Sequence, residues 1–181
     1  MRKVVVGEFV SLDGVTEAPE TWHMRFMDGD MMEFLQESFA ASDALLLGRV
    51  TYEEFAAAFG SGPAANSPFA QMMNARPKYV ASTTLQEVTW NNSTLIGGNL
   101  AEAVHRLKQQ PGKNIAVSGS GTLVQSLLEQ NLVDELHLLV HPVVVGRGKR
   151  LFQSVAPRTL QLVKSQTFGS GVVALTYASA V

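Results

Sequence analysis

Cysteine is absent from the 181 residues of the chain. This excludes disulfide bonds, cysteine-ligated zinc, iron–sulfur clusters and thiol nucleophiles, and it favours a reducing, intracellular setting. A charge excess is also lacking: 14 basic and 16 acidic residues give a net charge of −2, so no global positive field exists to hold nucleic acid or an anionic membrane. No apolar run reaches about 18 residues, and the run near the N-terminus is too short for a signal peptide. We therefore expect a cytoplasmic protein that binds neither nucleic acid nor membranes.

Length and composition favour one globular domain. The 181 residues fall within the range of about 100–200 that single domains usually occupy. Hydrophobic residues make up 46% and charged residues 17%, a balance typical of globular rather than disordered proteins. No repeat or linker interrupts the pattern, so we expect a single domain over residues 1–181.

Strand-like and helix-like segments alternate along the chain. Apolar and β-branched runs predict strands over 4–10, 44–47, 78–82, 94–96, 114–118 and 135–145, and a hairpin over 160–168 and 172–179. Apolar residues three and four apart predict helices over 30–39, 52–59, 100–107 and 122–131. Capping boxes at Asp30 and Asn99 would begin two of these helices, and the segment 60–70 is expected to be a surface loop.

These segments define a fold class. Repeated strand–helix–strand units need crossover connections, so most of the sheet should be parallel with helices on both faces. The closing hairpin must be antiparallel. We therefore predict a three-layer α/β fold with a mixed, mostly parallel central sheet and a C-terminal antiparallel hairpin.

The first of two glycine turns follows the predicted strand 44–47. Gly48 would let the backbone approach a ligand closely, and the next helix would offer free amides and a positive dipole end. Arg49 could pair with phosphate in a bidentate fork, and Thr51 could donate a hydroxyl hydrogen bond. A purely structural interpretation stays open, in which Thr51 caps the helix with Glu54 and Arg49 is solvated.

The second glycine turn lies between a strand and a helix. It consists of Gly119, Ser120, Gly121, Thr122 and Leu123. Its amides could cradle a diphosphate, although Val124 stands where glycine or alanine would complete the dinucleotide fingerprint. The alternative is a tight turn followed by a helix cap. An extended dinucleotide needs both turns, which must then meet at one rim of the sheet.

Charged residues follow two predicted strands. Asp13 comes after the first, where ligands of open α/β sheets lie, and Gly14 leaves room beside it. Asp13 could orient a polar substrate, or donate a proton if its surroundings raise its pKa; otherwise it is a turn residue. Near the C-terminus, Arg147, Lys149 and Arg150 form either a seat for a substrate phosphate or an exposed basic loop.

The sequence contains neither a hydrolase motif nor histidines spaced to bind one metal. Ser120 lies between two glycines but not in Gly-x-Ser-x-Gly, so no nucleophile elbow is present, and no Walker sequence occurs. His137 and His141 share a strand face but lie about 13 Å apart, too far to chelate one metal. His23, beside Trp22, could face a pocket. We expect no metal site.

Taken in order, these motifs resemble a known family. The chain is similar to the dihydrofolate-reductase-like fold, specifically to the reductase (C-terminal) domain of the bifunctional riboflavin-biosynthesis deaminase-reductase and its stand-alone bacterial relatives. The matching motifs, within residues 2–152, are Ser11-Leu12-Asp13-Gly14, Leu47-Gly48-Arg49-x-Thr51-Tyr52-Glu53, the strand 78–82 with Thr83, Ser118-Gly119-Ser120-Gly121-Thr122-Leu123, and Pro142-x-x-x-Gly146-x-Gly148. The His-x-Glu and Pro-Cys-x-x-Cys zinc motifs of the deaminase are missing, so the chain cannot deaminate.

The resemblance implies an NADPH-dependent reductase that pairs as a homodimer. The residues that would contact NADPH are Gly48, Arg49 and Thr51 at its phosphates, Ser82 and Thr83 at its 2′-phosphate, and Gly119, Ser120, Gly121, Thr122 and Leu123 around its diphosphate. The residues that would line the nicotinamide and the substrate are Phe9, Ser11, Asp13, Gly14, Gly146, Arg147 and Gly148. Arg49, with no acid in its turn, would suit NADP better than NAD.

Three functions follow as hypotheses. The first is an NADPH-dependent reductase of a small heterocyclic or carbonyl/imine substrate, with a riboflavin-pathway aminopyrimidine, 5-amino-6-(5-phosphoribosylamino)uracil, as the leading substrate and Asp13 as the catalytic residue. The second is a non-catalytic nucleotide-binding module, and the third is a dihydrofolate reductase. Turnover of NADPH against a substrate panel distinguishes them.

Overall fold

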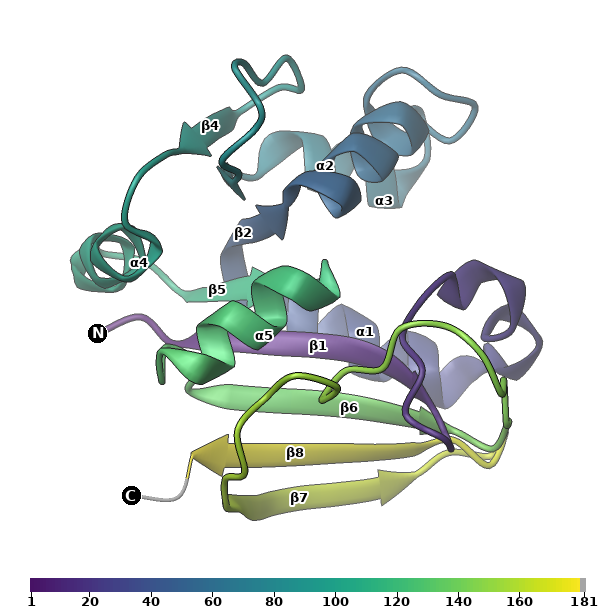
Figure 1. Ribbon diagram of the computed structural model, residues 1–181. Helices are drawn as coiled ribbons and strands as arrows, with labels where there is room; N and C mark the ends of the chain where they lie inside the picture. The colour runs from purple at the N-terminus through teal and green to yellow at the C-terminus, as the bar shows by residue number, and fades with distance from the viewer. Residues whose placement is uncertain (180–181) are drawn as a thin grey trace.

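The computed structural model describes residues 1–179, which form one eight-stranded sheet with helices on both faces (Figure 1). The strands are β1 (Val4–Ser11), β2 (Ser42–Gly48), β3 (Lys78–Ala81), β4 (Ser93–Ile96), β5 (Asn114–Val117), β6 (Glu135–His141), β7 (Leu160–Thr167) and β8 (Val173–Ser179). Their order is β4-β3-β2-β5-β1-β6-β8-β7. β8 is antiparallel to both neighbours, and the other pairs are parallel. The predicted fold class is confirmed.

The helices divide between the two faces. They are α1 (Gly29–Ala40), α2 (Arg49–Phe55), α3 (Pro68–Ala75), α4 (Leu100–Gln109) and α5 (Gly121–Glu129), with a π-helical stretch (Ala56–Gly60) continuing α2. α5 lies in front of β1 in Figure 1 and α1 lies behind it. On the α4–α5 face one continuous apolar cluster packs against β1, β2, β5 and β6. The opposite face carries two separate clusters, one over β2 and β3 and one over β6 and β8.

Two helix starts differ from the sequence prediction. α3 begins inside the segment 60–70 that we expected to be a loop: Ser67 accepts a hydrogen bond from the Ala70 amide, and Pro68 occupies the first helical position. α1 begins at Asp28 rather than Asp30, because it is the Asp28 side chain that accepts from the Met31 amide, 2.9 Å away. The cap at Asn99 is confirmed, since its side chain accepts from two amides of α4.

The connections diverge between the adjacent strands β1 and β5. The chain leaves β1 through α1 on one face of the sheet and leaves β5 through α5 on the other. Adjacent parallel strands whose connections diverge in this way form a topological switch point, where ligands of open α/β sheets bind. β5 ends at Val117, which pairs with Val6, so β1 runs on beyond β5 with only β6 beside it. This switch point lies at the carboxyl ends of the two strands.

Candidate functional site

The loops that follow β2, β3, β4 and β5 line one cavity of about 610 Å³. Among its lining residues are several that we predicted from the sequence: Gly48, Arg49, Ser82, Thr83, Ser120, Thr122 and Leu123. Sequence reasoning missed Gly98, Asn99 and Leu100, which belong to the turn after β4. The glycine pair at 97–98, directly after a predicted strand, was the signal that could have found them. The cavity thus combines four strand ends of the parallel sheet.

The two glycine turns touch each other at the rim of this cavity. A Cβ atom added at Gly48 would overlap the hydroxyl of Ser120. Gly119 has a φ of +67°, and a Cβ there would lie 2.7 Å from Thr51 Oγ1. Both positions therefore need glycine, because a side chain would force the two turns apart. The expectation that the turns meet at one rim is confirmed.

Thr51 is not the cap of α2. Gly48 is the N-cap of α2, and Thr51 lies buried in the first turn, against Gly119. The interpretation of Thr51 as a helix cap is therefore wrong, because it stands three residues past the cap position. Three of the predicted residues lie beside the cavity rather than in its lining: Thr51, Gly119 and Gly121. The contact between Thr51 and Gly119 keeps the two turns together.

Two polar side chains of the cavity, Arg49 and Ser82, make only weak or partial hydrogen bonds within the protein. Arg49 is half exposed and donates to Glu53, one helical turn on, at 2.9 Å. Exposed pairs of this spacing contribute only about 0.3–0.5 kcal/mol, so Arg49 can exchange this partner for a phosphate. Ser82 Oγ accepts from the amides of Thr84 and Leu85, at 3.1 and 3.0 Å, and lies 3.4 Å from the hydroxyl oxygen of Thr84. That long, exposed contact is weak, so the Ser82 hydroxyl can turn its proton toward a phosphate instead.

The start of α5 offers amide donors to the same space. Ser120 is the N-cap of α5, and its side chain makes no cap hydrogen bond. In α4, by contrast, Asn99 satisfies the amides of Ala101 and Glu102. The first amides of an uncapped helix, together with its positive dipole end, form an anion-binding site. This geometry suits a phosphate group in the cavity.

Glu8 is a half-buried acid on β1, close to the switch point, that sequence reasoning did not single out. It lies on β1, and its Oε1 accepts from the Gly119 amide at 2.9 Å. Burial raises the pKa of Glu8 to about 7, against the opposing effect of this hydrogen bond. The sequence signal was one acid inside a β-branched run. Glu8 thus ties the second glycine turn to the centre of the sheet.

Asp13 holds two loops together. Its carboxylate accepts from the amides of Val145 and Gly146, at 3.0 and 2.9 Å, and from the Ser11 hydroxyl at 2.7 Å. These bonds, led by the one from Val145, lower the pKa of Asp13 to about 2. Asp13 could donate a proton near pH 7 only if its pKa were raised. Its pKa is lowered instead, so Asp13 stays ionised and the expectation that it could be a proton donor is wrong. Ser11 is buried beneath it.

The basic loop lies next to Asp13. Gly146 and Gly148 adopt positive φ values, and Arg150 Nε donates to the Asp13 carbonyl at 3.0 Å. Arg147 and Lys149 are exposed. The structure thus brings the predicted substrate loop against the turn at Asp13 and Gly14, at the carboxyl ends of β1 and β6.

Phe9 and two histidines form an aromatic cluster. Phe9 stacks on His23 with ring centroids 4.4 Å apart, and His141 meets Phe9 edge-on at 5.5 Å. Both histidines are buried, and burial lowers the pKa of each. His23 therefore packs within the core around Phe9.

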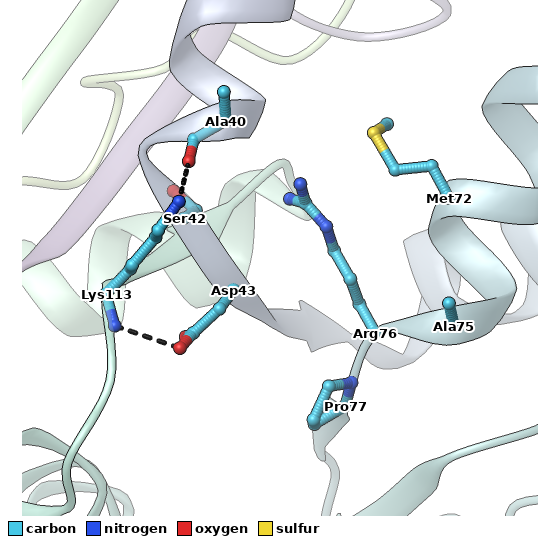
Figure 2. Close-up of a pocket in the computed structure, with 8 residues that line it drawn as sticks. All are labelled: Ala40, Ser42, Asp43, Met72, Ala75, Arg76, Pro77 and Lys113. Atoms are coloured by element: carbon cyan, nitrogen blue, oxygen red, sulfur yellow. Dashed lines mark hydrogen bonds between the residues drawn. The ribbon is translucent and has the colours of Figure 1, made fainter.

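A second cavity, of about 390 Å³, opens at the other end of the parallel strands. Figure 2 shows Asp43 and Arg76 on either side of it. Asp43 forms an ion pair with Arg2 and accepts from the Lys113 amide at 2.9 Å. The cavity lies where β2, β3 and β5 begin, so it is remote from the switch point and from the glycine turns. Of the two cavities, the one at the glycine turns therefore lies where ligands of such sheets bind.

Comparison of the whole structure defines the class of fold. A putative riboflavin biosynthesis protein from Shewanella sp. PV-4 superposes with a TM-score of 0.77, covering 99% of both chains at 21% identity. Dihydrofolate reductase from Enterococcus faecalis, complexed with NADP(H), gives 0.67 over 99% of this chain and 97% of its own, at 13% identity. The deaminase/5-amino-6-(5-phosphoribosylamino)uracil reductase of Thermotoga maritima gives 0.72, at 13% identity, over 99% of this chain and 57% of its own. The fold is dihydrofolate-reductase-like.

The family is defined by sequence. The RibD C-terminal domain family matches residues 2–174, and the chain belongs to this family. The uncharacterized proteins YyaP and YwjB of Bacillus subtilis (strain 168) are 32% and 29% identical to it. These matches cover 97% and 94% of this chain and 94% and 95% of the relatives. Within residues 1–179, the helices lack the length and apolar character needed to cross a membrane.

Proposed function

We propose that the protein is an NADPH-dependent reductase of a small heterocyclic or carbonyl/imine substrate. The observation that carries this proposal is the contact between the two glycine turns at the rim of the 610 Å³ cavity. An oxidoreductase is the activity that the family suggests. Bound NADPH would supply the hydride, and the protein would supply binding and orientation.

The residues of the cavity fit a phosphate-bridged dinucleotide. The amides of Gly121, Thr122 and Leu123 at the start of α5 would hold the diphosphate. Arg49, with Ser82 and Thr83 across the cavity, would hold the 2′-phosphate, since a guanidinium pairs strongly with phosphate oxygens. Gly48 and Gly119 keep the two turns close enough for one ligand to contact both.

The substrate would lie at the carboxyl ends of β1 and β6, beside the turn at Asp13 and the basic loop. Asp13 would act as an anion that orients the loop through the amides of Val145 and Gly146, rather than as an acid. The exposed cations Arg147, Lys149 and Arg150 would suit a phosphate on the substrate. Such a phosphate occurs in 5-amino-6-(5-phosphoribosylamino)uracil, which the name of the Thermotoga maritima enzyme contains. We propose this compound as the first substrate to test.

Arg49→Ala tests the cofactor site. We expect NADPH to raise the melting temperature of the wild type and NADH to raise it less, and the variant to bind NADPH more weakly by about 1–3 kcal/mol, because a charge-assisted hydrogen bond to phosphate is lost. Isothermal titration calorimetry measures this loss. Arg106→Ala is the matched control, since Arg106 forms a similar exposed pair with Glu102 on α4. If the Arg49 and Arg106 variants bind NADPH with equal affinity, Arg49 does not contact the cofactor.

Turnover separates the enzyme from a binding module. NADPH absorbance is followed with 5-amino-6-(5-phosphoribosylamino)uracil, dihydrofolate and a panel of small imines and ketones. Oxidation with the uracil supports the proposal, and oxidation with dihydrofolate alone makes the protein a dihydrofolate reductase. Tight NADPH binding without turnover on this panel favours a non-catalytic nucleotide-binding module.

We also propose a homodimer, formed through the sheet edge at β7. This strand is the last of the sheet, and Leu162 and Val163 on it are 50% and 61% exposed. An edge strand with apolar side chains is suited to pairing with a second copy. Light scattering should give a dimer for the wild type and a monomer for Val163→Lys. Thr94→Lys, on the opposite edge strand β4, should remain dimeric; a monomeric wild type contradicts this proposal.

A further inference from the structure

Arg76 borders the cavity of about 390 Å³ at the amino ends of β2, β3 and β5. Its Nη2 donates to the Phe39 carbonyl at 2.8 Å. Its Nη1 is shielded from solvent and, within residues 1–179, has no hydrogen-bond partner. Buried guanidinium groups are normally paired, because a charge removed from water without a partner destabilises the folded state. The structure thus leaves one donor of Arg76 unsatisfied beside this cavity.

The acid that faces Arg76 across the cavity, Asp43, is engaged elsewhere (Figure 2). One of its carboxylate oxygens pairs with Arg2, and the other accepts from the Lys113 amide at 2.9 Å. Burial lowers the pKa of Arg76 against the opposing effect of Asp43, but a guanidinium stays charged at neutral pH. An anion that enters the cavity therefore meets a cation whose charge Asp43 does not neutralise.

A second cation, Lys113, lies at the same cavity. It is exposed, and its Nζ donates to the Ala40 carbonyl at 2.9 Å. Arg76 donates to the carbonyl of the preceding residue, Phe39, so the two cationic groups meet at the last turn of α1. Each uses one donor there, whereas a lysine has three donors and an arginine has five. Two cations that converge in this way indicate a site for an anion.

The rest of the cavity wall is largely apolar. In Figure 2, Met72, Ala75 and Pro77 line one side of it, on and just after α3. The guanidinium of Arg76 also lies over the ring of Phe39, with Cζ 5.5 Å from the ring centre. Sites for small organic molecules combine such apolar walls with a few polar groups. A bare inorganic ion would leave the walls without contacts, so the composition of the cavity favours an organic anion.

We propose that this cavity is a second ligand site, which binds a small organic carboxylate with an apolar body of one ring. The carboxylate pairs with Arg76 and Lys113, and the ring packs against the apolar wall. Arg76 is only half-buried as a whole, so a rotation of its guanidinium brings Nη1 to the ligand. The site is separate from the cavity at the glycine turns, because it lies at the opposite ends of the parallel strands.

Three probes test the chemistry of the ligand: 3-phenylpropionate, its neutral amide 3-phenylpropionamide, and inorganic phosphate. An NMR titration of the full chain measures both the affinity and the place of binding. We expect 3-phenylpropionate to shift the backbone amides of residues 40–43, 75–76 and 113, and to bind at least about tenfold more tightly than either other probe, because it alone combines the charge with the apolar ring. Absence of binding, equal affinity for the amide or for phosphate, or shifts confined to the glycine turns overturns the proposal.

Two variants test the residues. Arg76→Gln removes the charge but keeps a donor for the Phe39 carbonyl, and Ala75→Phe fills the cavity from an exposed position. Each should weaken 3-phenylpropionate at least about tenfold. Arg106→Gln, which changes an exposed arginine of α4, should bind it as the wild type does. Ala75→Phe is decisive if Arg76→Gln folds poorly, and unchanged binding by Ala75→Phe contradicts the proposal.

A titration with NADPH separates this site from the proposed cofactor site. The wild type should bind 3-phenylpropionate with the same affinity in the presence and absence of NADPH, since the two cavities lie at opposite ends of the sheet. Competition between the two ligands would place the probe at the glycine turns and overturn this inference. A wild type that binds 3-phenylpropionate at Arg76 but does not bind NADPH contradicts the reductase and leaves the second site standing.

Discussion

Lys78→Met is expected to lower the free energy of unfolding by about 2–4 kcal/mol. Lys78 is fully buried at the start of β3, and its Nζ donates to the carbonyls of Met73 and Arg76, each at 2.7 Å. It also lies 4.5 Å from the ring centre of Trp90. Burial alone lowers the pKa of Lys78 to about 8, so the charged form is desolvated and depends on these acceptors. Methionine has a similar length but leaves the carbonyls at the end of α3 without their donor.

Urea denaturation at pH 7 measures this loss. Lys149→Met, in the exposed loop after β6, is the control for the change of side chain and should stay within about 0.5 kcal/mol of the wild type. If the Lys78 variant is as stable as this control, the prediction is wrong. The desolvation cost that is removed with the buried ammonium then equals the free energy of the lost hydrogen bonds.

Glu8→Gln is expected to remove a pH dependence of stability worth up to about 3 kcal/mol. In the folded protein Glu8 keeps its proton up to a pKa of about 7, whereas the unfolded chain releases it near the ordinary value of 4.5. Between these values the folded state binds more protons, so the stability of the wild type falls as pH rises, and it stays low above pH 7. Glutamine accepts from the Gly119 amide without ionising, so the variant should not show this fall.

Denaturation curves from pH 4 to pH 8 provide the comparison. The quantity of interest is the difference between the wild type and the variant, because other carboxylates contribute equally to both. Glu129→Gln, at the exposed end of α5, controls for the loss of one charge. Parallel stability profiles for the wild type and the Glu8 variant would show that the carboxyl ionises in the folded protein as freely as in the unfolded one.

The inner strands and the glycine turns were predictable because their signals are local. β1 is a β-branched run with one acid in it, β2 and β5 each contain a short apolar run, and Gly48 and Gly119 stand at the ends of β2 and β5. α3 was not predicted, since it is short and begins within a segment rich in glycine, proline and serine. Local sequence patterns therefore predict most strands and helices of this fold, but not a short helix such as α3 that starts within a loop-like segment.

The chemical state of the site residues depends on contacts between distant parts of the chain. Asp13 has a lowered pKa because amides 132 and 133 positions away donate to it. Glu8 has a raised pKa because the strand that carries it is buried in the completed sheet, with a turn 111 positions away as its partner. No short stretch of sequence contains these partners, so the direction of either shift could not be predicted from it.

The central place of β1 sets an order of events during synthesis. β1 leaves the ribosome before both of its neighbours in the sheet, β5 and β6, which end at Val117 and His141. Contacts between such widely separated segments form slowly, and an unpaired strand exposes its edge while it waits. The nascent chain must therefore keep the apolar segment of β1 from aggregating until residue 141 has been translated.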